Sequence, residues 1–324
     1  MPSATKKLPH IALNLNMLNQ SLNGRRTISG IKRLCMKRKV TRVLILGASG
    51  MLGNAMLRLF TESPNYETYG SVRSIGAVRL LPKILEKNVI TGLDVENIDA
   101  LVNLFATLCP DVVINCIGLI KQHAEADDPL TAIPINAVFP HRLARLCEVG
   151  QARLVHMSTD CVFSGSRGMY TEADLSDCND LYGRSKFLGE VDYPHAITLR
   201  TSLIGHELNS AHSLVGWFLA QVNTVKGFKH AIFSGLPTVE IAHVIRDFVI
   251  PHPELHGLYN VSAEPINKFD LLKLIAETYC KKIDIEADEK LVINRSLDST
   301  RFRNATGYVP KPWPVLIKKM HEFG

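Results

Sequence analysis

The sequence lacks the marks of a secreted or membrane-embedded protein. Its seven cysteines are odd in number, scattered along the chain and never spaced as C-x-x-C, which argues against a disulfide framework and a zinc site and indicates a reducing compartment. No apolar run approaches the roughly 18–20 residues of a membrane-spanning helix. The N-terminus has no apolar core of the kind found in secretory signals. We therefore expect a cytoplasmic protein without a metal site or a membrane partner.

Acidic residues are absent from positions 1–35, which carry six lysines and arginines. Without these six charges the net charge of +6 falls to zero, so the folded body shows no excess of basic residues. Aromatic residues make up only 7% of the chain, which gives no hint of a platform for stacking bases. We expect residues 1–39 to be a basic, disordered extension and expect no nucleic-acid partner. The extension faintly resembles an organelle transit peptide, and the reading that we prefer starts the protein at Met36.

Short apolar runs alternate with longer amphipathic ones beyond residue 40. Strands are expected at 43–46, 68–72, 88–93, 111–115, 153–158 and 196–204, and helices at 52–60, 98–108 and 131–149. Because the strands are apolar throughout rather than alternating, they suit a parallel sheet covered on both faces. The predicted fold class is α/β, a Rossmann-type doubly wound parallel sheet.

The alternation of predicted strands and helices becomes less regular after Gly205. Helices are expected at 214–225, 239–249 and 269–279, a strand at 257–261, and a polar tail punctuated by proline around 310–314. We expect residues 40–205 to form a dinucleotide-binding Rossmann domain, with 237–262 returning to it. Residues 206–324 would then form mainly a smaller, substrate-binding lobe.

A glycine triplet follows the first predicted strand at the point where a dinucleotide would bind. In the run Gly47-Ala48-Ser49-Gly50-Met51-Leu52-Gly53, glycines let the backbone turn sharply and approach a pyrophosphate, which sits on the amides of the next helix. The spacing is G-x-x-G-x-x-G rather than the general fingerprint G-x-G-x-x-G. Its place between a strand and a helix is what makes the signal specific. We therefore expect Gly47, Ser49, Gly50, Met51, Leu52 and Gly53 to bind the cofactor.

The ends of the next strands refine the choice of cofactor. Arg73 follows the second strand, with no acid beside it, and an arginine there accommodates the phosphate that distinguishes NADP from NAD. Asp94 follows the third strand, where it would accept from the adenine amino group or cap the next helix. Asn115, Cys116 and Gly118 close the fourth strand, either beside the cofactor or as an ordinary strand end. The predicted cofactor is NADP(H).

A tyrosine and a lysine four residues apart follow the fifth strand. Tyr182 and Lys186 would share one face of a helix. An ordinary tyrosine titrates near about 10, and a neighbouring ammonium together with the positive nicotinamide of the oxidised cofactor would lower that value. Tyr182 could then exchange a proton with a carbonyl oxygen while Thr159 hydrogen-bonds the same oxygen. Lys186 would also hold the ribose of the nicotinamide.

Three segments carry a family resemblance. GASGMLG (47–53), HMSTDCVFSG (156–165) and YGRSKFLGE (182–190) resemble the extended short-chain dehydrogenases, most of all the dTDP-4-dehydrorhamnose reductase branch. The resemblance runs from about Val40 to near the C-terminus. It implies Thr159, Tyr182 and Lys186 as a catalytic triad, Asp160 near a sugar, and an NADPH-dependent reductase of a nucleotide-activated 4-keto-6-deoxy sugar in polysaccharide biosynthesis. A homodimer is compatible with it.

Two positions depart from that pattern. Cys161 stands where the reductases usually have tyrosine, and Asn115-Cys116-Ile117-Gly118 replaces a plainer Asn-Ala-Ala or Asn-Ala-Gly. Cys161 also offers no carboxylate of the kind that the related 4,6-dehydratases use to expel water, which argues against a dehydratase. Arg200 and Arg301 are weaker candidates for gripping the nucleotide and its diphosphate.

Three other functions stay open. A sugar epimerase would return the hydride and retain its cofactor. The regulatory subunit of methionine adenosyltransferase resembles the same branch, and a protein of that kind would bind NADP without turnover. A regulator that senses NADP and uses the basic extension on nucleic acid has only that extension in its favour.

Overall fold

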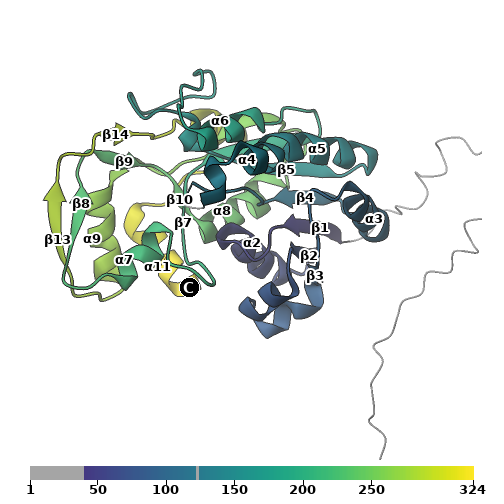
Figure 1. Ribbon diagram of the computed structural model, residues 1–324, viewed down its shortest axis with the longest axis horizontal. Helices are drawn as coiled ribbons and strands as arrows, with labels where there is room; N and C mark the ends of the chain where they lie inside the picture. The colour runs from purple at the N-terminus through teal and green to yellow at the C-terminus, as the bar shows by residue number, and fades with distance from the viewer. Residues whose placement is uncertain (1–39, 122–123) are drawn as a thin grey trace, which may run out of the picture. The chain divides into compact units, whose positions relative to one another are not determined.

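The computed structural model describes residues 40–121 and 124–324 (Figure 1). The predicted extension over residues 1–39 and the preferred start at Met36 lie outside this part. No helix in the described part is both long and apolar enough to cross a membrane. The same part holds no group of three or more His, Cys, Asp or Glu side chains arranged to bind a metal ion.

A seven-stranded sheet forms the centre of the fold, in the order β11-β6-β5-β4-β1-β2-β3. Every neighbouring pair in it is parallel. The strands are β1 (Thr41–Leu46), β2 (Tyr66–Val72), β3 (Val89–Thr91), β4 (Val112–Asn115), β5 (Arg153–Thr159), β6 (Ala196–Thr201) and β11 (Gly257–Asn260). The order reverses beside β1, as in doubly wound sheets, so the predicted Rossmann-type α/β class is confirmed.

Helices cover both faces of this sheet. On one face α2 (Met51–Thr61) and α8 (Thr238–Val244) pack over Val43 and Ile45 of β1. On the other face α3 (Ile98–Leu108) and α5 (Phe139–Val149) pack over Leu44 and Leu46. All four of these β1 side chains have no exposed surface. Burial on both faces is the reason that the strand reads as a continuous apolar run.

The helix predicted over 131–149 is interrupted by a wider turn. It consists of α4 (Pro129–Ala132), a π-helical segment (Ile133–Val138) and α5. Pro134 and Pro140 donate no backbone hydrogen bond, and a helix that contains such residues commonly shifts its pairing locally. π-Helical turns of this kind are frequent at functional sites.

Apart from α8 and β11, most of the chain after residue 201 builds a smaller group of elements, which lies to the left of the sheet in Figure 1. Its strands form small sheets in the orders β10-β7, β12-β9-β14 and β13-β8. The strands are β7 (Leu203–Ile204), β8 (Thr224–Phe228), β9 (Ala231–Phe233), β10 (Leu236–Pro237), β12 (Ile266–Asn267), β13 (Asp284–Asp288) and β14 (Ile293–Asn294). The helices are α7 (Leu214–Ala220), α9 (Lys268–Thr278), α10 (Thr300–Thr306) and α11 (Trp313–Phe323).

Two predictions in this region are wrong. The helix expected over 214–225 ends at Ala220, because Asn223 takes a positive φ of 67° and the next residues pair with β13. The polar tail expected around 310–314 leads into α11. Pro312 is the N-cap of that helix and Pro314 lies in its first turn. Proline is tolerated there because backbone N–H groups of the first turn have no acceptor within the helix.

Candidate functional site

The glycine triplet forms a tight turn between β1 and α2. Gly47 takes a φ of 83°, in the left-handed region that disfavours side chains. The Gly50 N–H donates to the Gly47 carbonyl oxygen at 3.0 Å. A Cβ on Gly53 would lie 2.1 Å from that same oxygen, so no side chain fits at this position. The glycines are therefore required for the helix to start directly over the turn.

The start of α2 presents backbone groups rather than side chains. Gly50 is the N-cap and gives no side-chain cap, and the first turn carries no acid. Leu52 points into the core, so it can offer only its amide, whereas Ser49 and Met51 are partly exposed. Amides at a helix N-terminus attract anions. The turn thus fits a pyrophosphate, and it brings together all six residues predicted there.

Arg73 and Asp94 lie beyond the ends of β2 and β3, and both side chains are exposed. Arg73 forms no ion pair with any residue that the structure describes. Asp94 Oδ1 accepts the Glu96 N–H at 3.0 Å. The N-cap of α3 is Asn97, whose Oδ1 accepts the Ala100 N–H at 3.1 Å. The alternative role of Asp94 as an N-cap is therefore wrong, whereas its contact with adenine stays a prediction.

The end of β4 is held by hydrogen bonds. Asn115 is fully buried; its Oδ1 accepts the Ile117 N–H at 3.1 Å, and its Nδ2 lies 3.1 Å from His156 Nδ1. Burial raises the pKa of the Cys116 thiol to about 12, so this side chain stays protonated. A Cβ on Gly118 would lie 3.7 Å from Lys186 Nζ. The chain thus passes directly beside the predicted catalytic lysine.

The helix α6 (Leu181–Leu188) carries Tyr182 and Lys186 one turn apart. Asp180 caps it by accepting the Gly183 N–H at 2.7 Å. A Cβ on Gly183 would lie 2.3 Å from the Cys161 carbonyl oxygen, so α6 packs tightly on the segment that follows β5. Lys186 is 5% exposed, and its Nζ donates to the Met157 carbonyl oxygen at 2.7 Å. The three predicted catalytic residues therefore meet at the end of β5.

The electrostatics of this cluster are set mainly by burial. Burial raises the pKa of Tyr182 above its ordinary value, the Cys161 thiol raises it further, and a hydrogen bond with Thr159 lowers it in part. Burial lowers the pKa of Lys186 to about 8, although Glu190 opposes that change. Lys186 is not among the groups that act on the Tyr182 pKa in the protein alone. The predicted lowering, which also needs the positive charge of the oxidised nicotinamide, stays a prediction. The Tyr182 phenol stays protonated, which suits a proton donor.

Asn136 is a residue of this site that the sequence patterns did not indicate. It lies fully buried in the π-helical segment, where its Oδ1 accepts the Leu119 N–H at 2.9 Å and its Nδ2 lies 3.2 Å from Ser185 Oγ. It therefore joins the segment after β4 to α6. A lone asparagine within a helical pattern gave no signal of this role.

Two basic side chains from the C-terminal elements also reach the site. Arg295 Nη1 lies 3.7 Å from Cys161 Sγ. The charges of Arg295 and Asp160 both act on Lys268. Asp160 is buried, and burial raises the pKa of its carboxyl against the opposing effect of Arg295. Neither basic residue was predicted, because each lies more than 100 residues from Thr159 in the chain.

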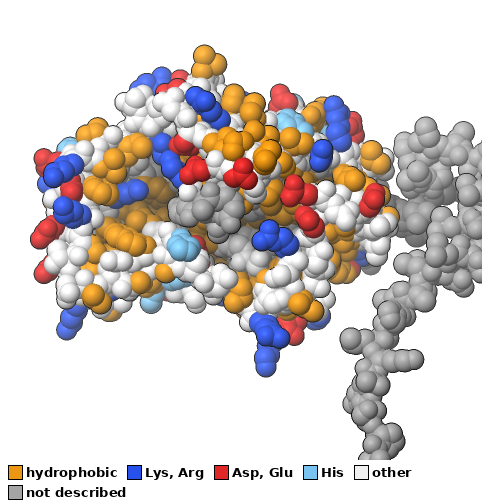
Figure 2. Space-filling view, in the orientation of Figure 1, with side chains coloured by type: hydrophobic (Ala, Val, Ile, Leu, Met, Phe, Trp, Pro, Cys, Tyr) orange, Lys and Arg blue, Asp and Glu red, His pale blue; other side chains and the backbone are white. Residues whose placement is uncertain are grey.

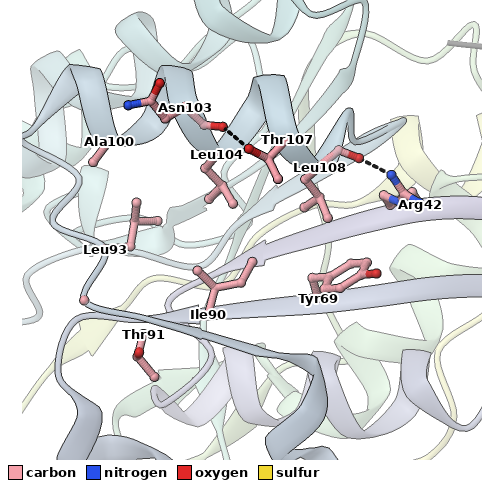
Figure 3. A pocket seen from close by; sticks show the side chains of 11 residues that line it. Arg42, Tyr69, Ile90, Thr91, Leu93, Ala100, Asn103, Leu104, Thr107 and Leu108 are labelled. Atoms are coloured by element: carbon pink, nitrogen blue, oxygen red, sulfur yellow. Dashed lines mark hydrogen bonds between the residues drawn. The ribbon is translucent and has the colours of Figure 1, made fainter. Parts of the chain in front are cut away.

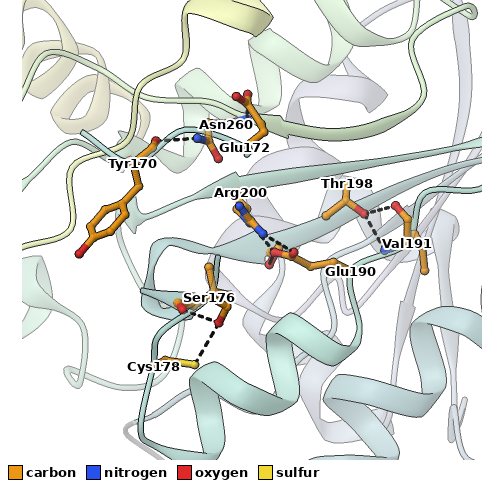
Figure 4. Close-up of polar contacts among 11 residues, drawn as sticks. Tyr170, Glu172, Ser176, Cys178, Glu190, Val191, Thr198, Arg200 and Asn260 are labelled. Atoms are coloured by element: carbon orange, nitrogen blue, oxygen red, sulfur yellow. Dashed lines mark hydrogen bonds and ion pairs between the residues drawn. The ribbon is translucent and has the colours of Figure 1, made fainter. Parts of the chain in front are cut away.

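Arg200 does not face an open site. It is 2% exposed, and its Nε and Nη2 donate to the two carboxylate oxygens of Glu190 at 2.7 and 2.6 Å (Figure 4). Ser158 Oγ donates to the same carboxylate at 2.7 Å. The geometry thus contradicts the weak expectation that Arg200 grips the substrate, because its charge is already paired inside the protein. Arg301 lies on the exposed surface, stacked over Tyr259 at 4.6 Å.

A cavity of about 590 Å³ lies away from this cluster, between α3 and the strands β2 and β3 (Figure 3). Its lining is largely apolar and includes Tyr69, Ile90, Leu104 and Leu108, with Arg42 at one end. None of the predicted cofactor, substrate or catalytic residues lines it.

Comparisons with known proteins show which proteins this chain is similar to. A dTDP-4-dehydrorhamnose reductase of Aggregatibacter actinomycetemcomitans is 23% identical over 309 residues, covering 88% of this chain and 99% of that protein. Methionine adenosyltransferase 2 subunit beta of Mus musculus is 34% identical over 149 residues, covering 46% of this chain and 41% of that protein.

Solved structures share the fold. A dTDP-4-dehydrorhamnose reductase from Bacillus anthracis in complex with NADP superposes with a TM-score of 0.72 at 21% identity, covering 88% of this chain and all of that one. The family model described as the RmlD substrate binding domain matches residues 41–290, well over half of the sequence. The chain therefore belongs to the RmlD substrate binding domain family.

Proposed function

We propose that this protein is an NADPH-dependent reductase of a nucleotide-activated 4-keto-6-deoxy sugar. The observation that carries the proposal is the meeting of Thr159, Tyr182 and Lys186 at the end of β5, with Lys186 Nζ beside Gly118. Membership of a family whose relatives include named reductases supports it. Free cysteines in the described part of the chain suit a cytoplasmic enzyme, and a homodimer is compatible with the proposal.

The roles of the residues follow from their chemistry. NADPH, held by the turn 47–53 with Arg73 at its extra phosphate, would supply the hydride. Thr159 would donate a hydrogen bond to the keto oxygen and polarise the carbonyl. Tyr182, whose pKa is raised, would remain a neutral phenol and transfer its proton to that oxygen. Lys186, held by the Met157 carbonyl, would keep a positive charge beside the reacting atoms at a pH below about 8.

A nicotinamide consumption assay tests the proposal. NADPH and NADH are compared against a panel of nucleotide 4-keto-6-deoxy sugars, with Tyr182→Phe as the matched variant. We expect rapid NADPH oxidation that falls by about 10²-fold or more without the phenol. Substrate conversion without net loss of NADPH would identify an epimerase instead.

A non-catalytic role is the second candidate. The 34% identity with a methionine adenosyltransferase 2 subunit beta over 149 residues favours a regulatory subunit that binds NADP. Tight NADPH binding with no oxidation across the whole panel would support this candidate and argue against the reductase.

A further inference from the structure

Glu190 is a buried acid just beyond the helix that carries the predicted catalytic tyrosine and lysine. The helix α6 ends at Leu188, and Glu190 follows Lys186 by four residues. Asp and Glu side chains are spread over the face of the protein drawn in Figure 2, where water screens their charge. The Glu190 side chain is only 9% exposed, so its charge is screened much less.

The ammonium and the carboxylate are both anchored at the end of β5. Lys186 Nζ donates to the carbonyl oxygen of Met157 at 2.7 Å, and the hydroxyl of the next residue, Ser158, donates to Glu190 Oε1 at 2.7 Å. Arg200 on β6 donates to both oxygens of the same carboxylate (Figure 4). Because each group is hydrogen-bonded to a neighbouring residue of one strand, the carboxylate is fixed close to the lysine.

Glu190 supplies the negative charge that acts on Lys186. The groups whose charge affects this lysine are Glu190 and Cys116, and burial raises the pKa of the Cys116 thiol to about 12, so it stays neutral. Burial and the Lys186 charge lower the pKa of His156 on β5, so this ring is neutral as well. Burial raises the pKa of Tyr182, which stays a neutral phenol. Among these described neighbours, Glu190 is therefore the ionised one.

Other charges near the cluster act elsewhere. Asp160 and Asp180 raise the pKa of Tyr182 and are not among the groups that affect Lys186. Arg200 is paired with Glu190 and does not affect Lys186 either. Burial lowers the pKa of Lys186 to about 8 although the carboxylate opposes this change. Without that carboxylate the ammonium would therefore lose its proton at a lower pH, closer to neutrality.

We propose that Glu190 is a positioning residue of this enzyme, whose buried carboxylate holds the ammonium of Lys186 at the end of β5. Glu190 acts through Lys186, because its own oxygens are bonded to Arg200 and Ser158. The ammonium that it holds is the group expected beside the ribose of the nicotinamide. The inference rests on the proposed function, since it takes NADPH to be bound by Lys186.

The affinity for NADPH as a function of pH tests this inference. Fluorescence titrations between about pH 6 and about pH 10 compare the wild type with Glu190→Gln and with Glu190→Gln/Arg200→Met, in which no buried charge is left unpaired. Lys186→Met shows which part of the pH dependence comes from the lysine. Glu240→Gln is the matched control, because Glu240 is 4% exposed and accepts a hydrogen bond from Lys319 at 2.8 Å. Far-UV circular dichroism at each pH shows that every variant is folded.

We expect the affinity of the wild type and of Glu240→Gln to fall with a midpoint near pH 8. In both Glu190 variants the midpoint should lie lower by about one pH unit. The double variant decides between the two roles of Glu190, because its stability should recover while its midpoint stays low.

A double variant with the midpoint of the wild type would show that Glu190 serves only as the partner of Arg200, and it would overturn the proposal. An equal shift in Glu240→Gln, a wild type without a pH-dependent step, or a wild type that binds no NADPH would overturn it too. If no sugar of the panel is reduced but the Glu190 variants still shift the midpoint, the proposed reaction fails and the role of Glu190 stands.

Discussion

Replacing Glu190 by glutamine should strongly destabilise this protein. The carboxylate accepts three hydrogen bonds, two from Arg200 and one from Ser158, and the Arg200 side chain is 2% exposed. Glutamine keeps the shape but removes the negative charge, so the Arg200 guanidinium is left buried and unpaired. Breaking one side of a buried pair costs about 3–5 kcal/mol. With about 2–4 °C of Tm for each kcal/mol in a large domain, the midpoint should fall by roughly 6–20 °C.

The assay is thermal unfolding followed by circular dichroism, with two comparison variants. Glu148→Gln removes a carboxylate that is paired with Arg145 on the exposed surface, and it should leave the midpoint unchanged. In the double variant Glu190→Gln/Arg200→Met no unpaired charge remains, so much of the loss should be recovered. A single variant that melts within about 2 °C of the wild type would refute the reasoning. So would a double variant that is the least stable of the set.

Three further predictions concern the cofactor site. Gly53→Ala places a Cβ 2.1 Å from a backbone oxygen and should weaken NADPH binding at least about tenfold by fluorescence titration; Gly76→Ala, which meets only Ser74 Oγ at 3.9 Å, should not. Arg73→Met should weaken NADPH binding about tenfold while leaving NADH binding unchanged, and equal losses for both cofactors would contradict its assignment to the phosphate. The pKa of Lys186 is lowered to about 8, so the ammonium is present below that pH and lost above it. The affinity for NADPH should therefore fall as the pH rises through about 8. The Lys186→Met variant should show no such pH-dependent step.

Much of the fold could be predicted from local patterns. The strand after Val40 and the glycine turn are specified by residues next to each other in the chain, and the structure places both where the sequence did. The end of α7 could not be found this way. Val225 continues an apolar pattern, but its backbone pairs with Ile285, sixty residues later, and this pairing overrides the helical spacing.

The candidate site likewise contains residues that local spacing predicts and residues that only distant pairing brings together. Tyr182 and Lys186 lie in one helix, so their spacing alone predicts that they share a face. Arg295 approaches Cys161 only because β14 pairs with β9, which no local pattern reveals. For Arg200 the local pattern was misleading, because a charged residue at a strand end suggests a side chain that faces an open site. Its partner Glu190 becomes visible only when β6 and the end of α6 are placed together.

The strand β11 has a consequence for how the protein folds during synthesis. It pairs with β6, but some fifty residues of C-terminal elements are made between the two strands. The apolar core that begins at Val43 also includes Ile317 and Met320 of α11. A nascent chain that ends before Gly257 therefore leaves an edge strand and much of this core open to water. We expect folding to be slow, to be completed only after α11 has emerged from the ribosome, and to depend on protection from aggregation until then.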